Sequence, residues 1–328
     1  MFRYIGQRIL ILIPLLLIIS VITFVLIQLP PGDFLTMYVM KLKAAGSDVA
    51  REQIAALTKM YGLDKPLYIQ YFFWMRNILL RGEFGTSFTY NQPVSELLGE
   101  RIPLTVAVSI LTTLFIWAMA VPIGIYSATH QYSFFDYFWT LVGFIGVATP
   151  SFLVALIVIW IAFSQFDISA IGLFSPGYEA APWSWAKLVD LLKHIWVPIV
   201  IIGLSGTAGL IRVMRGTVLD ELNKQYVITA RAKGMKERDL LLKYPVRVAI
   251  NPLISTIGWM LPGIISGEVL VSMVLNIPTT GPLLLRALLN QDMFLAGSIV
   301  MLLSTLTVIG TLISDILLVW LDPRIRYV

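Results

Sequence analysis

Residues 226–243 read YVITARAKGMKERDLLLK, a charged stretch between two long apolar runs. The pattern predicts two short helices. Thr217 is placed to cap the first, and Gly234 to end it in a left-handed conformation. The second is expected over about 236–244, where Pro245 stops it. One face of this pair is too apolar for free solution, and the whole is too charged to enter a bilayer.

The apolar runs on either side belong to a series of six. Of the 328 residues, 58% are hydrophobic and 13% are charged, whereas a soluble domain carries about 25% charged residues. Each run is nearly free of charge and about long enough to cross a bilayer. We therefore expect an all-α membrane protein with six transmembrane helices, over roughly 9–29, 102–128, 137–166, 195–211, 248–277 and 293–321.

The basic residues indicate which way the chain is oriented. If the chain has six spans, its N-terminus, its C-terminus and the charged loop all lie on the same side of the membrane. The N-terminus carries Arg3 and Arg8, and the C-terminus carries Arg324 and Arg326. The positive-inside rule places that side, with both termini, in the cytoplasm. The loop carries four acidic residues, Asp220, Glu221, Glu237 and Asp239, against nine basic ones, Arg212, Arg215, Lys224, Arg231, Lys233, Lys236, Arg238, Lys243 and Arg247.

We divide the chain into three parts: 1–29 with the first span, a small extracytoplasmic helical segment over 30–101, and a five-helix core over 102–328 that includes the charged loop 216–247. Within the segment we expect helices over about 49–61 and 66–81 and a short helix starting at Pro93. The segment either caps the ends of the spans or docks an external partner.

Several classes of chemistry are absent from the sequence. There is no cysteine, so disulfides and thiolate sites are excluded. His130 and His194 lie in separate segments and are expected at membrane boundaries, not in a metal site. The chain has no G-x-x-x-x-G-K-[ST] loop for nucleotide phosphates and no convincing nucleophile–base pair. The net charge of +5 gathers beside the spans, which argues against nucleic acid as a partner.

From the residues alone the charged loop has two interpretations. It lies flat on anionic lipid, or it docks in a groove of a cytoplasmic partner. Here the chain resembles the peptide permeases of the oligopeptide/dipeptide/nickel group of ABC importers, whose YVxTARAKG pattern fits Tyr226, Val227 and Thr229 to Gly234. Further motifs of the group occur in the same order: PPGD (30–33), YGLDKPLYIQY (61–71), RGEFGTSF (81–88), Pro150 to Phe152 and LDPRIRY (321–327).

The chain also departs from the wider family. In the general Glu-Ala-Ala loop motif of ABC importer permeases, only Ala230 and Gly234 match strictly, and the closing Leu-Pro is absent at Val246 and Arg247. After the fifth span, Ile277 replaces the tryptophan that is common in the peptide group.

The resemblance implies a transport subunit in a cytoplasmic membrane, not an enzyme. It implies a second permease, in a heterodimer, two cytoplasmic subunits that bind ATP and Mg²⁺, an external substrate-binding protein and surrounding lipid. The helices over 217–245 would couple ATP hydrolysis to transport. The residues carried over to this role are Tyr226, Thr229, Ala230, Arg231, Ala232, Lys233, Gly234 and Met235.

Glu268 raises a separate question because it lies inside the fifth span. A carboxylate facing lipid there costs about 2.5 kcal/mol or more, so Glu268, with Ser272, either lines a translocation path or reaches the outer interface. Peptide is the expected cargo, with oligosaccharides or nickel complexes as alternatives. A secondary transporter or channel is the competing class, but it normally shows more ionisable groups inside its spans.

Overall fold

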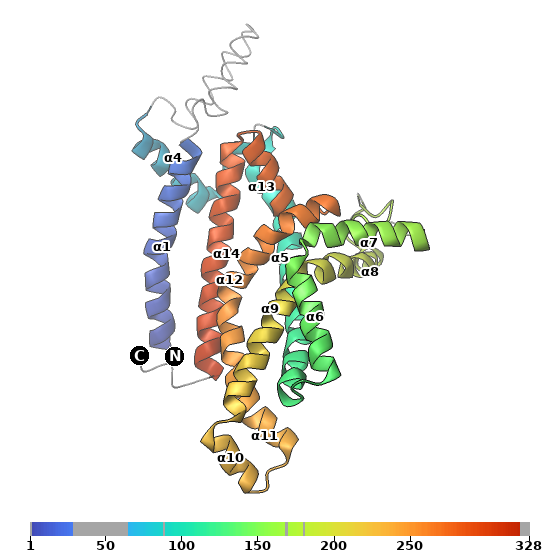
Figure 1. Cartoon of the computed structure of the whole chain (residues 1–328). Helices are drawn as coiled ribbons and strands as arrows, with labels where there is room; N and C mark the ends of the chain where they lie inside the picture. Colours follow the sequence, from blue (N-terminus) through green and yellow to red (C-terminus); the bar gives the residue numbers. More distant parts are fainter. Residues whose placement is uncertain (1, 29–64, 88, 168–169, 180, 322–328) are drawn as a thin grey trace, which may run out of the picture. The chain divides into compact units, whose positions relative to one another are not determined.

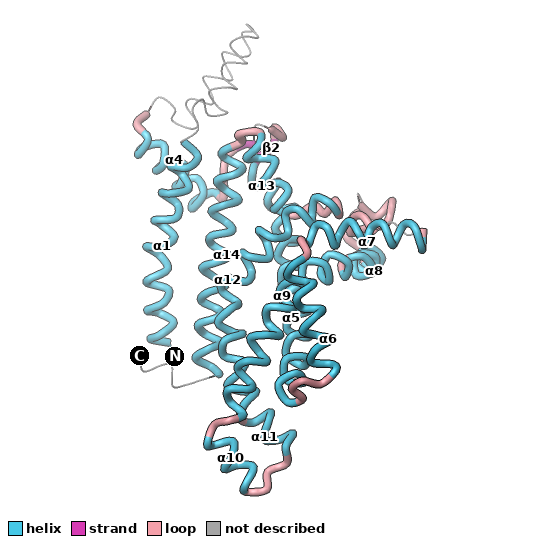
Figure 2. The backbone as a smooth tube through the Cα atoms, in the orientation of Figure 1, coloured by secondary structure: helices cyan, strands magenta, loops and turns pink. Residues whose placement is uncertain are grey.

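The computed structural model describes residues 2–28, 65–87, 89–167, 170–179 and 181–321. Apart from loops and turns, this part is helical except for two strands of two residues each (Figures 1 and 2). The expected helix over 49–61 and the motif at the C-terminus fall outside it. The helices are α1 Phe2–Gln28, α4 Leu67–Arg81, α5 Val94–Thr129, α6 Phe134–Ala148, α7 Ser151–Phe166, α8 Trp185–His194, α9 Trp196–Leu222, α10 Gln225–Ala232, α11 Glu237–Lys243, α12 Pro245–Val274, α13 Thr280–Leu289 and α14 Met293–Leu321.

Three described stretches are long and apolar enough to cross a membrane: Val94–Thr129, Trp185–Leu222 and Phe294–Trp320. They overlap the second, fourth and sixth expected spans. The third expected span is not one continuous helix, because α6 and α7 meet at an angle of 104°. Thr149 and Pro150 separate them, and a proline disfavours helical backbone at the residue before it. Counting that bent pair as one span gives up to four spans within the described residues.

The first and fifth expected spans also fall on helices. The apolar stretch Leu10–Leu26 belongs to α1 and is shorter than the other spans. The fifth span corresponds to α12, which runs for 30 residues. The side chains of residues 258–268 in that helix, Glu268 included, lie outside the described part.

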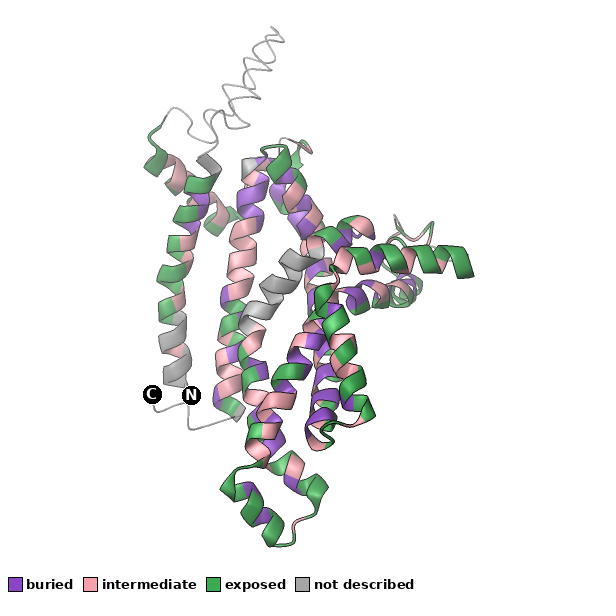
Figure 3. Ribbon diagram, in the orientation of Figure 1, coloured by how far each residue is buried: buried purple, intermediate pink, exposed green. Residues whose placement is uncertain are grey.

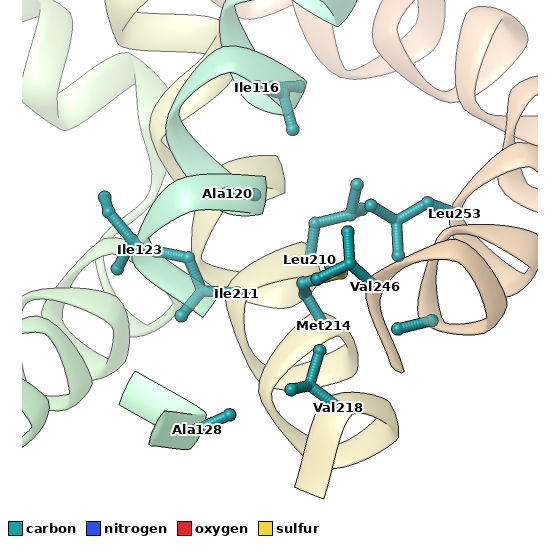
Figure 4. Packing of buried hydrophobic residues seen from close by; sticks show 11 residues of the cluster. Ile116, Ala120, Ile123, Ala128, Leu210, Ile211, Met214, Val218, Val246 and Leu253 are labelled. Carbon is teal, nitrogen blue, oxygen red and sulfur yellow. The ribbon is translucent and has the colours of Figure 1, made fainter. Parts of the chain in front are cut away.

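The chain divides into two compact units, one built around residues 106–277 and the other around residues 7–105 and 278–308. In the first unit, α9 packs against α6 and α12. Its core gathers side chains of α5, α9 and α12 (Figure 4). Helices approach closely there: a Cβ added to Gly124 of α5 would lie 2.6 Å from the Cβ of Met214 in α9. Small residues at such crossings are typical of helix pairs in membranes.

The fourth span ends later than the sequence pattern predicts. α9 continues to Leu222, so Thr217 lies inside this helix and is not an N-cap. Its hydroxyl donates to the carbonyl oxygens of Val213 and Met214, at 2.9 and 3.1 Å. A threonine inside a helix commonly makes such bonds to the preceding turn. The capping prediction is therefore wrong, because the neighbouring apolar residues continue the helix.

The second unit contains the helix predicted over 66–81, which is confirmed as α4. A short antiparallel ribbon follows, β1 Thr86–Ser87 paired with β2 Gln92–Pro93. The short helix expected from Pro93 is instead the first part of the 36-residue α5, and Pro93 itself lies in β2. Proline has no N–H to donate to a neighbouring strand, so it is tolerated only where that donor is not needed, as at the edge of a sheet.

Asp292 holds this ribbon against the start of α14. Its carboxylate accepts hydrogen bonds from the Ser87 hydroxyl at 2.5 Å and from the Thr89 N–H at 3.1 Å. The residue is fully buried. Because a buried carboxylate needs such donors, Asp292 fixes the position of the ribbon within the unit.

Candidate coupling site

α10 and α11 form a compact helical pair at one end of the first unit, beyond the ends of α9 and α12 (Figure 1). Their contact is a small apolar cluster of Val227, Ala230 and Leu240, each at most 7% exposed. Met235 and Tyr244 pack against it. Burial of these side chains holds the two short helices together, because neither is long enough to be stable alone.

Gly234 makes the bend between the two helices. Its φ of +79° lies in the left-handed region, as predicted. The N–H of Gly234 donates to the carbonyl of Arg231 at 3.0 Å, and the N–H of Met235 donates to that of Ala230 at 3.3 Å. These two bonds define a Schellman motif. The turn thus satisfies the end of α10 and folds Met235 back onto the apolar cluster.

An ion pair spans the same bend. Arg231 Nε and Nη2 donate to the Glu237 carboxylate at 3.1 and 2.5 Å. The hydrogen bond from Arg231 holds the pKa of the Glu237 carboxyl below its usual range. Both side chains are about half exposed, 48% and 55%, so water screens their attraction. We therefore expect the pair to add little to the stability of the fold.

The outer surface of α10 carries most of the residues singled out by the sequence (Figure 3). Exposed are Tyr226, Thr229, Arg231, Ala232, Lys233 and Gly234. Tyr226, Thr229 and Ala232 recur every third residue and so share one face of the helix. Arg231 and Lys233 are exposed beside this face, and Arg231 is paired with Glu237.

Two of the predicted residues have a different place. Ala230 is buried and Met235 is half-buried, so both belong to the inside of the helical pair. The Tyr226 hydroxyl donates to the Glu221 carboxylate at the end of α9, and the rings of Tyr226 and Tyr244 lie 5.9 Å apart. These contacts connect α10 to the end of α9 and to Tyr244, the residue just before α12.

The two residues proposed for a translocation path lie on α12, apart from this pair in the sequence. Ser272 is fully buried, and its carbonyl accepts the N–H of Ile277 at 2.7 Å, closing the end of α12. Glu268 falls on the same helix, and its side chain belongs to the undescribed ones. A path through these residues stays a prediction.

Sequence reasoning missed an ion pair between α6 and α9. Asp136, near the start of α6, accepts two hydrogen bonds from Arg215 of α9, from Nε and Nη2, both at 3.0 Å. The Asp136 side chain is 4% exposed and that of Arg215 is 29%. From the sequence, Arg215 was counted among the basic residues of the charged loop. One signal in the sequence could have placed Asp136 in the first turn of a helix. Ser133, three residues earlier, caps α6 by accepting the N–H of Asp136.

These features define a class: a multi-span helical membrane protein that presents a folded, basic helical pair at one end of a core unit. Comparison with known sequences specifies the family. Residues 120–327 match the model described as binding-protein-dependent transport system inner membrane component, and residues 1–109 match the model of its N-terminal part. The chain belongs to this family of ABC transporter permeases; it is the inner membrane component and not the ATPase.

Relatives match along the whole length. The chain is 36% identical over 328 residues to the oligopeptide transport system permease protein AppB of Bacillus subtilis, with 100% of both chains covered. It is 30% identical to the oligopeptide transport system permease protein OppB of Haemophilus influenzae, again over both full chains. The peptidoglycan transport system permease protein YejB of Agrobacterium fabrum is 28% identical and covers 99% of this chain and 98% of its own.

Proposed function

We propose that this permease forms part of the path by which an ABC importer moves oligopeptides across the cytoplasmic membrane. The observation that carries the proposal is the full-length similarity, at 36% and 30% identity, to two permeases named for oligopeptide transport. An external binding protein delivers the cargo, as the family description implies. A second, homologous permease completes the path in a heterodimer, and two cytoplasmic subunits bind ATP and Mg²⁺.

The proposed topology has six spans with both termini in the cytoplasm. It is supported by the basic loop around α10 and α11 and by helices at each expected span. The bent pair α6 and α7 then counts as one span. Residues 1–29 supply the first span, 30–101 the extracytoplasmic segment and 102–328 the five-helix core. The loop 216–247 faces the ATPase.

The helical pair α10 and α11 is the proposed coupling element. Its exposed face of Tyr226, Thr229 and Ala232 fits a groove, as an amphipathic helix fits its partner. The exposed Tyr226 hydroxyl also bonds to Glu221 at the end of α9, and α11 is followed by α12 at Pro245. A movement of the ATPase would therefore reach two long helices of the core at once.

Uptake by reconstituted vesicles tests the function. We expect the complete complex, with its binding protein and ATP, to accumulate a labelled oligopeptide, and to leave a labelled oligosaccharide, a peptidoglycan fragment and a nickel complex outside. Uptake that proceeds without ATP would refute the assignment as an importer. Preferential uptake of one of the other three solutes would refute oligopeptide as the cargo.

Glu268→Gln is expected to slow peptide uptake in the same vesicles. An unchanged rate of uptake and an unchanged range of substrates would remove Glu268 from the proposed path.

Gly234→Pro tests the coupling element. Proline fixes φ near −65° and has no N–H, so it can form neither the +79° backbone nor the bond to Arg231. We expect ATP hydrolysis to continue while peptide uptake is lost, with the spans still inserted. Ala230→Leu, which overfills the apolar cluster, should act the same way.

Gly216→Ala is the matched control, because an added Cβ there meets nothing within 4 Å. Normal ratios of peptide taken up to ATP hydrolysed in both Gly234→Pro and Ala230→Leu would contradict the coupling role.

A further inference from the structure

α8 turns two of its charged side chains, Lys187 and Asp190, inward. Lys187 is 6% exposed and Asp190 is 8% exposed. The Lys187 ammonium donates to the carbonyls of Glu179 and Ala181, at 3.1 and 2.6 Å. It also lies 4.9 Å from the ring centre of Phe174. These partners satisfy the buried charge, so Lys187 is held by the loop 170–184 that precedes the helix.

Asp190 is satisfied on the same side of the helix. Its two carboxylate oxygens accept the N–H and the hydroxyl of Ser175, both at 2.7 Å. The loop therefore covers the polar side of α8 with specific bonds, and only the opposite side of the helix is left outward.

That outward side is apolar and aromatic. Trp185, Leu188, Leu192 and Trp196 follow one another at helical spacing. Trp185 is 79% exposed, Leu192 is 59% exposed and Trp196 is 57% exposed. We call these four residues the tryptophan face. Trp183 is not part of it, because its ring centre lies 5.3 Å from the Lys187 ammonium, on the side that the loop covers. A helix in water arranges its side chains the other way, with apolar residues buried and charges outside.

The position of α8 indicates which apolar medium meets this face. Together α8 and α9 form the 38-residue stretch Trp185–Leu222, but the 27 residues of α9 already measure about 40 Å and suffice to cross a hydrocarbon core of about 30 Å. α8, with 10 residues, is therefore not needed for the crossing. It ends one residue before α9, an apolar helix that belongs to an expected span. Tryptophan is enriched where a membrane meets water. Lys193, exposed at the edge of the face, is placed to reach lipid phosphates.

We propose that α8 lies flat in the interface of the outer leaflet, with the tryptophan face in the boundary between headgroups and acyl chains. The occupant of this face is lipid, and the loop 170–184 covers the helix from the water side. The side of the membrane rests on the proposed topology; the contact with lipid does not. The helix thereby holds the outer end of α9 at a fixed depth while the inner end follows the coupling helices.

The absence of cysteine makes the natural chain a background for site-directed labels. Leu188→Cys and Leu192→Cys place a nitroxide on the tryptophan face, and Glu179→Cys places one on an exposed polar position of the covering loop. The labelled complex is reconstituted with its partner subunits into vesicles of phosphatidylcholine and phosphatidylglycerol. Collision with oxygen, which concentrates in the bilayer, is compared with collision with a nickel chelate added outside.

We expect the ratio of oxygen to nickel collisions to be several-fold higher at 188 and 192 than at 179. Frequent nickel collisions at 188 and 192 would place the face in water. Infrequent collisions with both reagents would mean that a protein, such as the second permease, covers it. Either result overturns the proposal.

Two results separate the proposal from the topology and the proposed function. A label at 179 that the nickel chelate reaches only on the ATPase side would reverse the topology and leave the lipid contact intact. Uptake assays on the same labelled vesicles report the cargo independently of both measurements.

Discussion

Asp136→Ala is expected to destabilise the protein by about 3 kcal/mol, because it leaves the Arg215 guanidinium without its partner. Arginine cannot shed its proton to escape such a site. The value is at the low end of the range for broken buried pairs, since Arg215 is 29% exposed and can reach some water. The variant also loses the acceptor for the Tyr132 N–H, 3.0 Å from the Asp136 carboxylate, so the turn before α6 should loosen.

The temperature at which the purified complex loses its size-exclusion peak measures this effect. Glu237→Ala is the matched control, because it removes the acid of the exposed pair with Arg231, where little change is expected. Asp136→Asn should fall between, since an amide oxygen still accepts the Tyr132 N–H. Equal unfolding temperatures for Asp136→Ala and Glu237→Ala would show that the buried pair contributes nothing.

Gly124→Leu is expected to prevent α5 and α9 from packing. An added Cβ would already lie 2.6 and 2.8 Å from Cβ and Cγ of Met214 and 3.2 Å from the carbonyl oxygen of Ile211. The first of these atoms is fixed to the backbone, and Met214 is fully buried, so the helices must separate. Even Gly124→Ala should cost about 1–3 kcal/mol through overpacking, although alanine favours a helix by about 1 kcal/mol over glycine.

Gly99→Ala in the same helix provides the comparison, because nothing lies within 4 Å of its added Cβ. It should leave the unfolding temperature unchanged or raise it, through helix propensity alone. The leucine variant should give little assembled complex at all. A complex with Gly124→Ala that is as stable as the one with Gly99→Ala would mean that the crossing of α5 and α9 is looser than described.

The charged loop 216–247 was the most predictable part of the molecule, because its structure depends on local signals. A glycine, two short helical patterns and a proline within twenty residues specify a bent pair, and Gly234 has the expected backbone. The boundary with the preceding span was not predictable from such signals. Thr217 has the chemistry of a cap, but the packing of α9 against α6 and α12 favours a continued helix.

The sequence by itself determined that the chain is a helical membrane protein with a basic loop at one end and a resemblance to peptide permeases. These properties follow from composition, periodicity and motifs, which are local. Only the tertiary structure decided that Ala230 faces inward, that Asp136 meets Arg215 across 79 positions, and that α8 buries Lys187 and Asp190. Each depends on which helices pack together, and side chains far apart in the sequence meet only through that packing.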